Sequence, residues 1–149
     1  MLKKIAGIIW RKLTPSLRRK IVRITQDEFT VSVAAIIINE DNEVLLLDHV
    51  LRPSSNWGVP GGFLNRGEQP EEAVRRELRE ETGIELNNVK LFQIKTIDRH
   101  IEVLFCAEPV GFASVKSREI NAVGWFKSGE MPENMNRIQK STIESLLKS

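Results

Sequence analysis

The sequence predicts a single α/β domain, with helices layered on a mixed or antiparallel sheet, behind a basic helical arm. A chain of 149 residues, 41% hydrophobic and 28% charged, has the size and composition of one compact globular domain. Its apolar segments follow in the order β, β, α, β, β, β, α. Short turns of the hairpin type join the consecutive strand segments, so a doubly wound parallel sheet is excluded.

Composition excludes several other classes of protein. No apolar run approaches the roughly 20 residues that a membrane-spanning helix requires. The single cysteine, Cys106, can form no internal disulfide, and we interpret it as a small core residue of a protein in the reducing cytoplasm. The average apolar and charged fractions exclude a disordered or fibrous chain.

Residues 1–28 are predicted to form the arm. Eight basic residues precede Asp27, the first acid, so residues 1–24 carry a charge of +8 and the rest of the chain carries −6. Apolar residues at helical spacing predict two amphipathic helices separated by Pro15: Leu2, Ile5, Ile9 and Leu13, then Leu17, Ile21 and Ile24. Three roles stay open: contact with an anionic membrane surface, which would make the protein peripheral to a membrane, contact with RNA, or packing on the domain or a second copy as a homodimer.

The domain, residues 29–149, begins with strands. The Val- and Ile-rich segment 30–38 and the segment 44–47 flank turn residues 39–42, which predicts a hairpin. A loop at 53–56 leads to Trp57 and to Pro60-Gly61-Gly62, whose glycines indicate unusual backbone angles.

A helix is predicted from Pro70 to Thr82, with proline in its first turn and Gly83 as a left-handed cap. A second hairpin joins segments 89–97 and 101–107 through Asp98-Arg99-His100. A short strand at 123–126 and a closing helix over 138–147 complete the domain.

Three glutamates of the helix at 70–82, namely Glu77, Glu80 and Glu81, are three and four residues apart and share one face. At 100° per residue, Glu81 lies about 20° and Glu77 about 60° from Val74, at the border of the apolar stripe. Because like charges repel there, a hard divalent cation such as Mg²⁺ or Mn²⁺ would stabilise the cluster. The alternative is an ordinary solvated helix with alternating charges.

The surrounding spacing favours the cation. It reads Gly62, five residues, Glu68, seven residues, Arg76-Glu77-Leu78, one residue, Glu80-Glu81, one residue, Gly83-Ile84. This pattern resembles the Nudix box of the Nudix hydrolase superfamily at every defined position. The order of segments from Phe29 to Leu147 is also similar to the Nudix α/β/α sandwich with its mixed sheet.

The resemblance implies a hydrolase that uses Mg²⁺ or Mn²⁺ to cleave a phosphoanhydride in a nucleoside triphosphate or a nucleoside diphosphate linked to another group. Glu80 and Glu81 match the metal-binding pair, and Glu77 matches a further ligand or the base. Arg76 matches the arginine that orients the glutamates, Glu68 a supporting ligand, and Gly61 a residue whose carbonyl often joins the metal. Glu119, near the strand at 123–126, is a candidate for a further ligand or base, or a solvated loop acid.

Three residues near the glycines are candidate substrate contacts, each with a plainer alternative. Arg52 can pair with a phosphate or lie free in solvent. Trp57 and Phe63 can stack on a base or pack in the core. His49 and His100 are isolated in the sequence, and we predict no metal role for them.

Two alternative functions remain open. Hydrolysis of 5′-triphosphorylated RNA would use the arm to contact the RNA backbone and would be sensitive to salt. A nucleotide-binding Nudix module without turnover is disfavoured, because every glutamate of the box is present. The proline and tyrosine that mark relatives acting on ADP-ribose or dinucleoside polyphosphates are absent, so the substrate within the family is not specified.

Overall fold

The structure is a computed structural model that describes residues 2–52 and 56–148, with the backbone alone at residues 2–5. The loop predicted at 53–56 therefore lies outside the described residues except for Asn56. In chain order the elements are α1 (Leu2–Lys12), α2 (Pro15–Thr25), β1 (Thr30–Ile37), β2 (Val44–His49), β3 (Trp57–Gly58), β4 (Gly61–Phe63), α3 (Pro70–Thr82), β5 (Glu85–Ile97), β6 (His100–Val110), β7 (Ile120–Phe126) and α4 (Arg137–Leu147).

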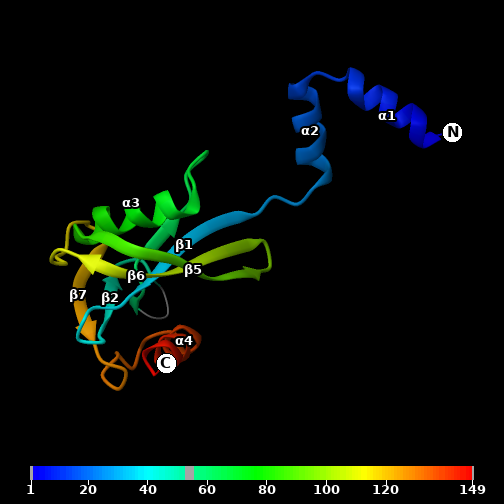
Figure 1. Ribbon diagram of the computed structural model, residues 1–149. Helices are drawn as coiled ribbons and strands as arrows, with labels where there is room; N and C mark the ends of the chain where they lie inside the picture. The colour runs from blue at the N-terminus through cyan, green and yellow to red at the C-terminus, as the bar shows by residue number, and fades with distance from the viewer. Residues whose placement is uncertain (1, 53–55, 149) are drawn as a thin grey trace. The chain divides into compact units, whose positions relative to one another are not determined.

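The chain divides into two compact units, residues 1–30 and 31–149. The first unit contains α1 and α2, which follow one another at the beginning of the chain (Figure 1). The hydroxyl of Thr14 accepts a hydrogen bond from the amide of Leu17 at 3.4 Å, so it caps α2. The guanidinium of Arg18 donates to the carbonyl of Arg11 at 2.7 Å at the end of α1. Both predicted helices therefore form, and side chains fix the turn between them.

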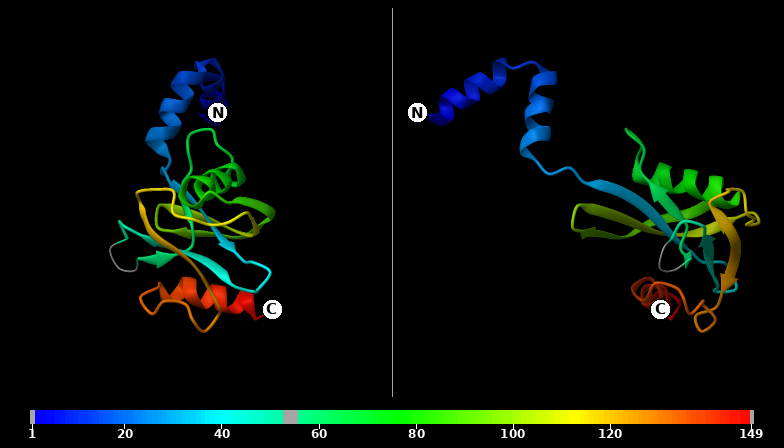
Figure 2. Two further views of the ribbon diagram at one scale, coloured as in Figure 1. Left: turned by 90° about the vertical axis from the view of Figure 1, so that its left-hand side faces the viewer. Right: turned by 180° about the vertical axis from the view of Figure 1, so that it is seen from behind.

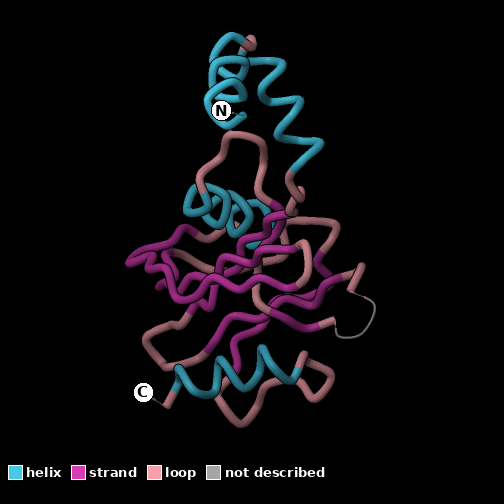
Figure 3. Tube along the Cα trace, turned by 90° about the vertical axis from the view of Figure 1, so that its right-hand side faces the viewer, coloured by secondary structure: helices cyan, strands magenta, loops and turns pink. Residues whose placement is uncertain are grey.

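The second unit is an α/β/α sandwich. Its strands form two sheets, in the orders β4-β1-β6-β5 and β3-β2-β7. Helices α3 and α4 cover opposite sides of these strands (Figure 2), and the trace in Figure 3 shows the same three layers. This arrangement confirms the predicted fold class. The first predicted hairpin is wrong in its pairing, because β1 and β2 belong to different sheets and, among the described residues, pair only at the bridge between Ile38 and Val44.

The direction of β1 against β6 makes the first sheet mixed. Near the start of both strands, the hydroxyl of Ser32 lies 2.8 Å from Nε2 of His100. Past the end of β1, the amide of Ile38 donates to the carbonyl of Ala107 at 3.1 Å. Contacts that advance together along both strands mean that β1 and β6 run parallel, whereas β1 with β4 and β5 with β6 pair antiparallel.

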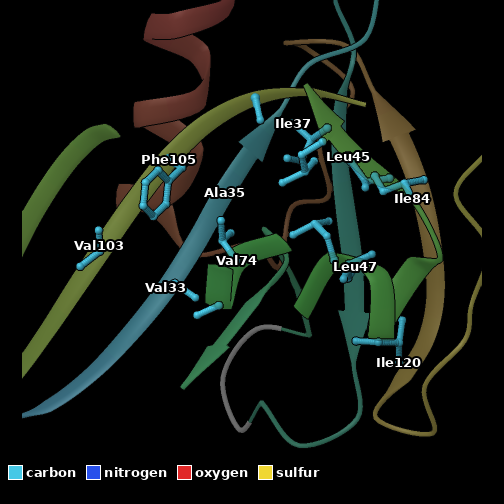
Figure 4. Packing of buried hydrophobic residues seen from close by; sticks show 14 residues of the cluster. Val33, Ala35, Ile37, Leu45, Leu47, Val74, Ile84, Val103, Phe105 and Ile120 are labelled. Atoms are coloured by element: carbon cyan, nitrogen blue, oxygen red, sulfur yellow. The ribbon is translucent and has the colours of Figure 1, made fainter. Parts of the chain in front are cut away.

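Strand β1 is buried on both faces because it lies at the centre of the sandwich. Val33, Ala35 and Ile37 pack with residues of α3 in one core cluster (Figure 4). The alternate residues Ala34 and Ile36 pack in a second cluster on the side of α4. Burial on both faces explains why this strand is a continuous apolar run in the sequence. Each fully buried aliphatic side chain contributes roughly 1.5–3 kcal/mol.

Two short strands were not expected from the sequence. Strand β4 pairs with residues 32–34 of β1, and β3 pairs with residues 47–48 of β2. Runs of two and three residues are too short for a period to be recognised, so only the tertiary pairing defines them. For the same reason β5 and β6 extend beyond their predicted bounds, through a ladder that continues across two irregularities.

Candidate active site

Helix α3 positions the glutamates of the box. It begins at Pro70 with a capping box, in which the amide of Gln69 donates to the Glu72 carboxylate at 3.1 Å. It ends at Gly83, whose φ of 77° is left-handed and whose amide donates to the carbonyl of Arg79. These bounds are the predicted ones, and they determine which side chains face the sheet.

The three glutamates of the shared face differ in burial in the order that their helical angles predict. The side chain of Glu81 is 8% exposed, that of Glu77 16% and that of Glu80 59%. The cluster therefore extends from the apolar core to solvent. A carboxylate at the inner end requires a compensating partner, because a buried charge without one is strongly unfavourable.

Glu81 is the innermost of the three carboxyls. Its Oε2 accepts a hydrogen bond from the amide of Gly61 at 3.2 Å, and its Oε1 lies 4.0 Å from Nδ1 of His49. Burial raises the pKa of Glu81 to about 8, and repulsion by the nearby Glu77 adds to the increase. Burial and the charge of Arg52 lower the pKa of His49 to about 4. The imidazole is therefore neutral at pH 7, and its contact with Glu81 is not an ion pair.

Arg76 holds the outer carboxylates together. Its Nε and Nη2 donate to the two oxygens of Glu68 at 2.8 and 3.0 Å. Its Nη1 donates to Glu77 at 2.7 Å and to Glu80 at 3.3 Å. Hydrogen bonds from Arg76 lower the pKa of Glu68 to about 2. One guanidinium thus sets the orientation of three glutamate side chains.

The paired glycines bring the backbone of β4 against these side chains. A Cβ at Gly62 would lie 2.4 Å from the carboxyl carbon of Glu77. At Gly61, where φ is +153°, a Cβ would lie 2.2 Å from the carbonyl oxygen of Val33. Any side chain here would push Glu77 aside or break the pairing of β4 with β1, which explains why both positions are glycine.

A cavity of about 590 Å³ opens beside the cluster. Seven of the predicted site residues line it: Arg52, Gly61, Phe63, Glu77, Glu80, Glu81 and Glu119. A second cavity of about 300 Å³ shares Arg52, Glu102 and Gln139 with the first and continues toward α4. A larger cavity, of about 790 Å³, lies at the turn after β1 and along β5 and β6, and none of its lining residues is a predicted site residue.

Three predicted residues do not line the 590 Å³ cavity in the part of the chain that the structure describes. Glu68 and Arg76 lie behind it, bonded to each other. Trp57 packs edge to face against Phe126, with ring centroids 5.2 Å apart, beside the core on the side of α4. For Trp57 the geometry therefore favours packing in the core over stacking on a base.

For Phe63 the core-packing alternative is wrong. The residue is 65% exposed and lines the cavity, and its only described ring contact is an edge-to-face approach to His100 at 6.0 Å. The reason is that Phe63 is the last residue of β4, an edge strand of its sheet, and pairs with Ser32, which precedes the buried residues 33–37 of β1.

Among the lining residues that sequence reasoning missed are His49, Glu102 and Gln139. For Glu102 a signal existed, because a single acid interrupts the apolar run 101–107 of a strand. Gln139 carries no local signal, and it reaches the cavity only because α4 packs beside β3. Its side-chain oxygen accepts a hydrogen bond from the amide of Val59 at 3.3 Å.

Arg52 lies over the backbone of β3. Its Nη2 donates to the carbonyl of Val59 at 3.3 Å, and its guanidinium takes the space that a side chain at Gly58 would need. Burial lowers the pKa of Arg52, and the charges of Glu81 and Glu102 oppose that effect. A guanidinium remains charged in proteins, so Arg52 is a fixed cation on the wall of the cavity.

The donor set fits a hard divalent cation. Glu77, Glu80, Glu81 and Glu119 offer carboxylate oxygens to one cavity, and oxygen is the ligand that Mg²⁺ and Mn²⁺ prefer. Within residues 2–52 and 56–148, no three acidic, histidine or cysteine side chains converge on one ion position as they stand. The hydrogen bonds explain this, because Arg76 draws Glu77 and Glu80 toward itself while Gly61 holds Glu81. A divalent cation in this cavity would compete with these hydrogen bonds for the carboxylate oxygens.

Known proteins are similar to this chain in both sequence and fold. A family model of the NUDIX domain matches residues 28–146. A MutT-like protein of Streptomyces ambofaciens is 35% identical over 111 residues, which cover 73% of this chain and 71% of that protein. The NAD-capped RNA hydrolase NudC of Vibrio atlanticus is 30% identical over 102 residues, which cover 66% of this chain but only 38% of that protein.

A solved structure, the MutT NUDIX hydrolase of Burkholderia pseudomallei, superimposes with a TM-score of 0.70 at 28% identity. The superposition covers 79% of this chain and 98% of that one. A NUDIX hydrolase of Nitrosomonas europaea has the same fold at a TM-score of 0.72, with 22% identity over 83% of this chain and 72% of that one. The domain match, the box and the sandwich agree, and the chain belongs to the Nudix hydrolase superfamily.

Proposed function

We propose that the protein hydrolyses a phosphoanhydride bond in a nucleoside triphosphate or a nucleoside diphosphate derivative, with Mg²⁺ or Mn²⁺ held by Glu77, Glu80 and Glu81. The observation that carries the proposal is the graded row of carboxylates on α3, which lines one cavity together with the cation Arg52. The names of the relatives, a MutT-like protein and a hydrolase of NAD-capped RNA, support a nucleotide-linked substrate.

The carboxylates and the arginine have complementary tasks. A bound divalent cation would neutralise charge on the phosphate oxygens and lower the pKa of a water molecule. Glu81, held by the amide of Gly61, supplies the inner oxygen ligand, and Glu80 supplies the solvent-facing one. Arg52, which lines the same cavity, can pair with a phosphate oxygen.

The general base is one of two carboxylates. Glu77 already accepts a hydrogen bond from Arg76 at 2.7 Å, which directs its carboxylate toward the guanidinium. Glu119 lies in the loop before β7, and the carbonyl of the same residue accepts a hydrogen bond from the amide of Val50 at 2.9 Å, so the loop is anchored. We therefore assign the base to Glu119, with Glu77 as a ligand.

The second cavity is the place proposed for the nucleoside. It continues from Arg52 and Glu102. Its polar lining comes from β5, with Gln93 and Lys95, from α4, with Gln139 and Thr142, and from Asn136 before α4. A cavity of about 300 Å³ next to the carboxylates lets one molecule place its phosphates at α3 and its base toward α4.

Phosphate and pyrophosphate release from a panel of substrates tests the proposal. The panel contains nucleoside triphosphates, nucleotide sugars, dinucleotides, and capped and 5′-triphosphorylated RNA, each with Mg²⁺, with Mn²⁺ or with a chelator. Glu80→Gln is the test variant, and Glu71→Gln is its control, because Glu71 lies on the same helix in an exposed pair with Arg75. Metal-dependent turnover that is lost in the first variant and retained in the second is the expected result.

Equal turnover in Glu80→Gln would contradict the metal assignment. Nucleotide binding without turnover of any substrate, in protein that binds Mn²⁺, would favour the non-catalytic module. Turnover confined to 5′-triphosphorylated RNA, with an affinity that falls steeply as salt rises, would favour the RNA alternative.

A further inference from the structure

Positive charge is concentrated in the arm, residues 1–28, which contains α1, α2 and the turn between them. Residues 1–26 contain eight lysines and arginines and no acid, whereas the rest of the chain is net negative. Arg11 and Lys12 lie in the last turn of α1, and Arg23 lies in the last turn of α2. The arm is therefore suited to an anionic partner.

Helix α2 combines this charge with an apolar face. At 100° per residue, Leu17, Ile21 and Ile24 lie within about 60° of one another. Leu17 is 44% exposed and Ile24 76%, and the helix buries none of its residues. Arg19 and Arg23 lie on the opposite side of the helix. The helix is thus amphipathic, with no buried residue on its apolar side.

Helix α1 repeats the pattern. Ile9 and Leu13 lie about 40° apart on one side, and Arg11 lies about 160° from both. Ile9 is 57% exposed, and the next residue in the chain, Trp10, is 40% exposed. Tryptophan is enriched at the boundary between lipid and water, because its ring has an apolar body and a polar N–H group.

The chemistry of these two helices distinguishes among the occupants. An RNA strand would neutralise the basic residues but would leave Ile9 and Ile24 in water. A second copy of the arm would cover the apolar residues but would bring two groups of eight positive charges together. A membrane surface with anionic lipids satisfies both properties, since its headgroups attract Lys and Arg and its acyl chains receive the apolar side chains.

We propose that the arm docks the protein on anionic phospholipid membranes, with α1 and α2 lying in the plane of the interface. No helix in the described part of the chain is long and apolar enough to cross a membrane, and an interfacial helix requires no such length. The hydrogen bond from Arg18 of α2 to the carbonyl of Arg11 of α1 connects the two helices. This proposal is independent of the proposed substrate.

Flotation of the full chain with vesicles tests the proposal. One set of vesicles is phosphatidylcholine alone, and the other contains about 30% phosphatidylglycerol, both at about 150 mM salt. The expected result is partition onto the anionic vesicles at least about 10-fold stronger than onto the neutral ones. Absence of binding to the anionic vesicles would overturn the proposal.

Two matched variants of α2 separate apolar insertion from simple charge attraction. Ile24→Gln and Val22→Gln each remove one exposed aliphatic side chain without a change of charge, but Val22 lies about 140° away from Leu17, off the apolar face. Ile24→Gln is expected to weaken partition about 10-fold and Val22→Gln less than about 2-fold. Equal effects of the two variants would overturn the proposal, since they would mean that no apolar face inserts.

A double arginine variant and a light-scattering measurement of oligomeric state test the proposal even if Ile24→Gln disturbs α2. Arg19→Gln combined with Arg23→Gln leaves the apolar face intact and is expected to weaken binding to anionic vesicles about 10-fold. Unchanged binding in this variant would overturn the role of charge. Binding of RNA oligomers in place of vesicles, or a dimer in light scattering that Ile24→Gln dissociates, would assign the arm to those partners instead.

Discussion

The α-carbon of Gly62 faces the carboxylate of Glu77 so closely that a Cβ would lie 2.4 Å from the carboxyl carbon. This contact joins β4 to α3 and keeps the Glu77 side chain beside Arg76, at 2.7 Å from its Nη1. The glycine of the box thus has a steric role at the site, and its backbone lies in strand β4.

Gly62→Ala should reduce kcat/KM by at least about 100-fold, because the added methyl group displaces Glu77 from its position. The thermal midpoint should fall by only a few degrees, since the Glu77 side chain is near the surface of the cluster. Gly129→Ala is the matched control, because a Cβ at Gly129 meets nothing within 4 Å. Equal kinetics of the two variants would show that the position of Glu77 does not matter for turnover.

Arg76→Lys should lower kcat while the protein stays folded. Lysine keeps the charge but cannot donate to Glu68, Glu77 and Glu80 in the fixed planar geometry of a guanidinium. A loss of about 10- to 100-fold is expected in steady-state kinetics. The control is Arg79→Lys, because Arg79 pairs with Glu85 at an exposed site. A similar loss in the control would indicate a general effect of the substitution.

The stability of the metal-free protein should fall as pH rises from about 6.5 to about 8. In this range the native Glu81 carboxyl, with its pKa raised to about 8, still binds a proton that the unfolded chain has released. While the native state binds this extra proton, each increase in pH lowers the free energy of unfolding, until Glu81 is deprotonated in both states. His49, with its pKa lowered to about 4, has the opposite effect, but only below its unfolded pKa of 6.5.

Urea unfolding in a chelator at pH 6.5 and pH 8 measures this effect, which is of the order of 1 kcal/mol. Glu81→Gln should abolish the decrease, because its amide does not titrate. A decrease of the same size in Glu81→Gln would place the titration on another group.

Mg²⁺ should raise the thermal midpoint of the wild type, by about 2.7 kcal/mol of stabilisation at a concentration 100 times the dissociation constant. Glu80→Gln should lose most of that increase. Without metal the same variant should be as stable as the wild type or slightly more stable, because one of three repelling carboxylates is gone. Differential scanning calorimetry with and without Mg²⁺ checks both points, and lower stability of metal-free Glu80→Gln would argue against repulsion.

Removal of residues 1–28 should leave the hydrolysis of small nucleotides unchanged within about 2-fold, because the cavity and its carboxylates belong to the unit of residues 31–149. Kinetics of the shortened chain on a dissolved nucleotide check this prediction. Loss of folded protein on removal would mean that the arm packs on the domain or on a second copy.

The sequence alone was sufficient for features that depend on local periodicity. The bounds of α3, the helices of the arm and the burial order of Glu81, Glu77 and Glu80 all follow from 3.6 residues per turn and from residues such as Pro70. The spacing of the box was also readable, because its residues are close together in the chain.

The tertiary structure decided what depends on contacts between distant segments. Strands β3 and β4, the parallel direction of β1 and β6, and the positions of Glu102 and Gln139 arise from pairing and packing across long separations. Trp57 is the clearest case. A tryptophan next to the glycine turn is equally suited to a base or to the core, and only the place of Phe126 on β7 directs its ring inward. Side-chain direction at such positions is set by which layer lies opposite, and that information is not local to the sequence.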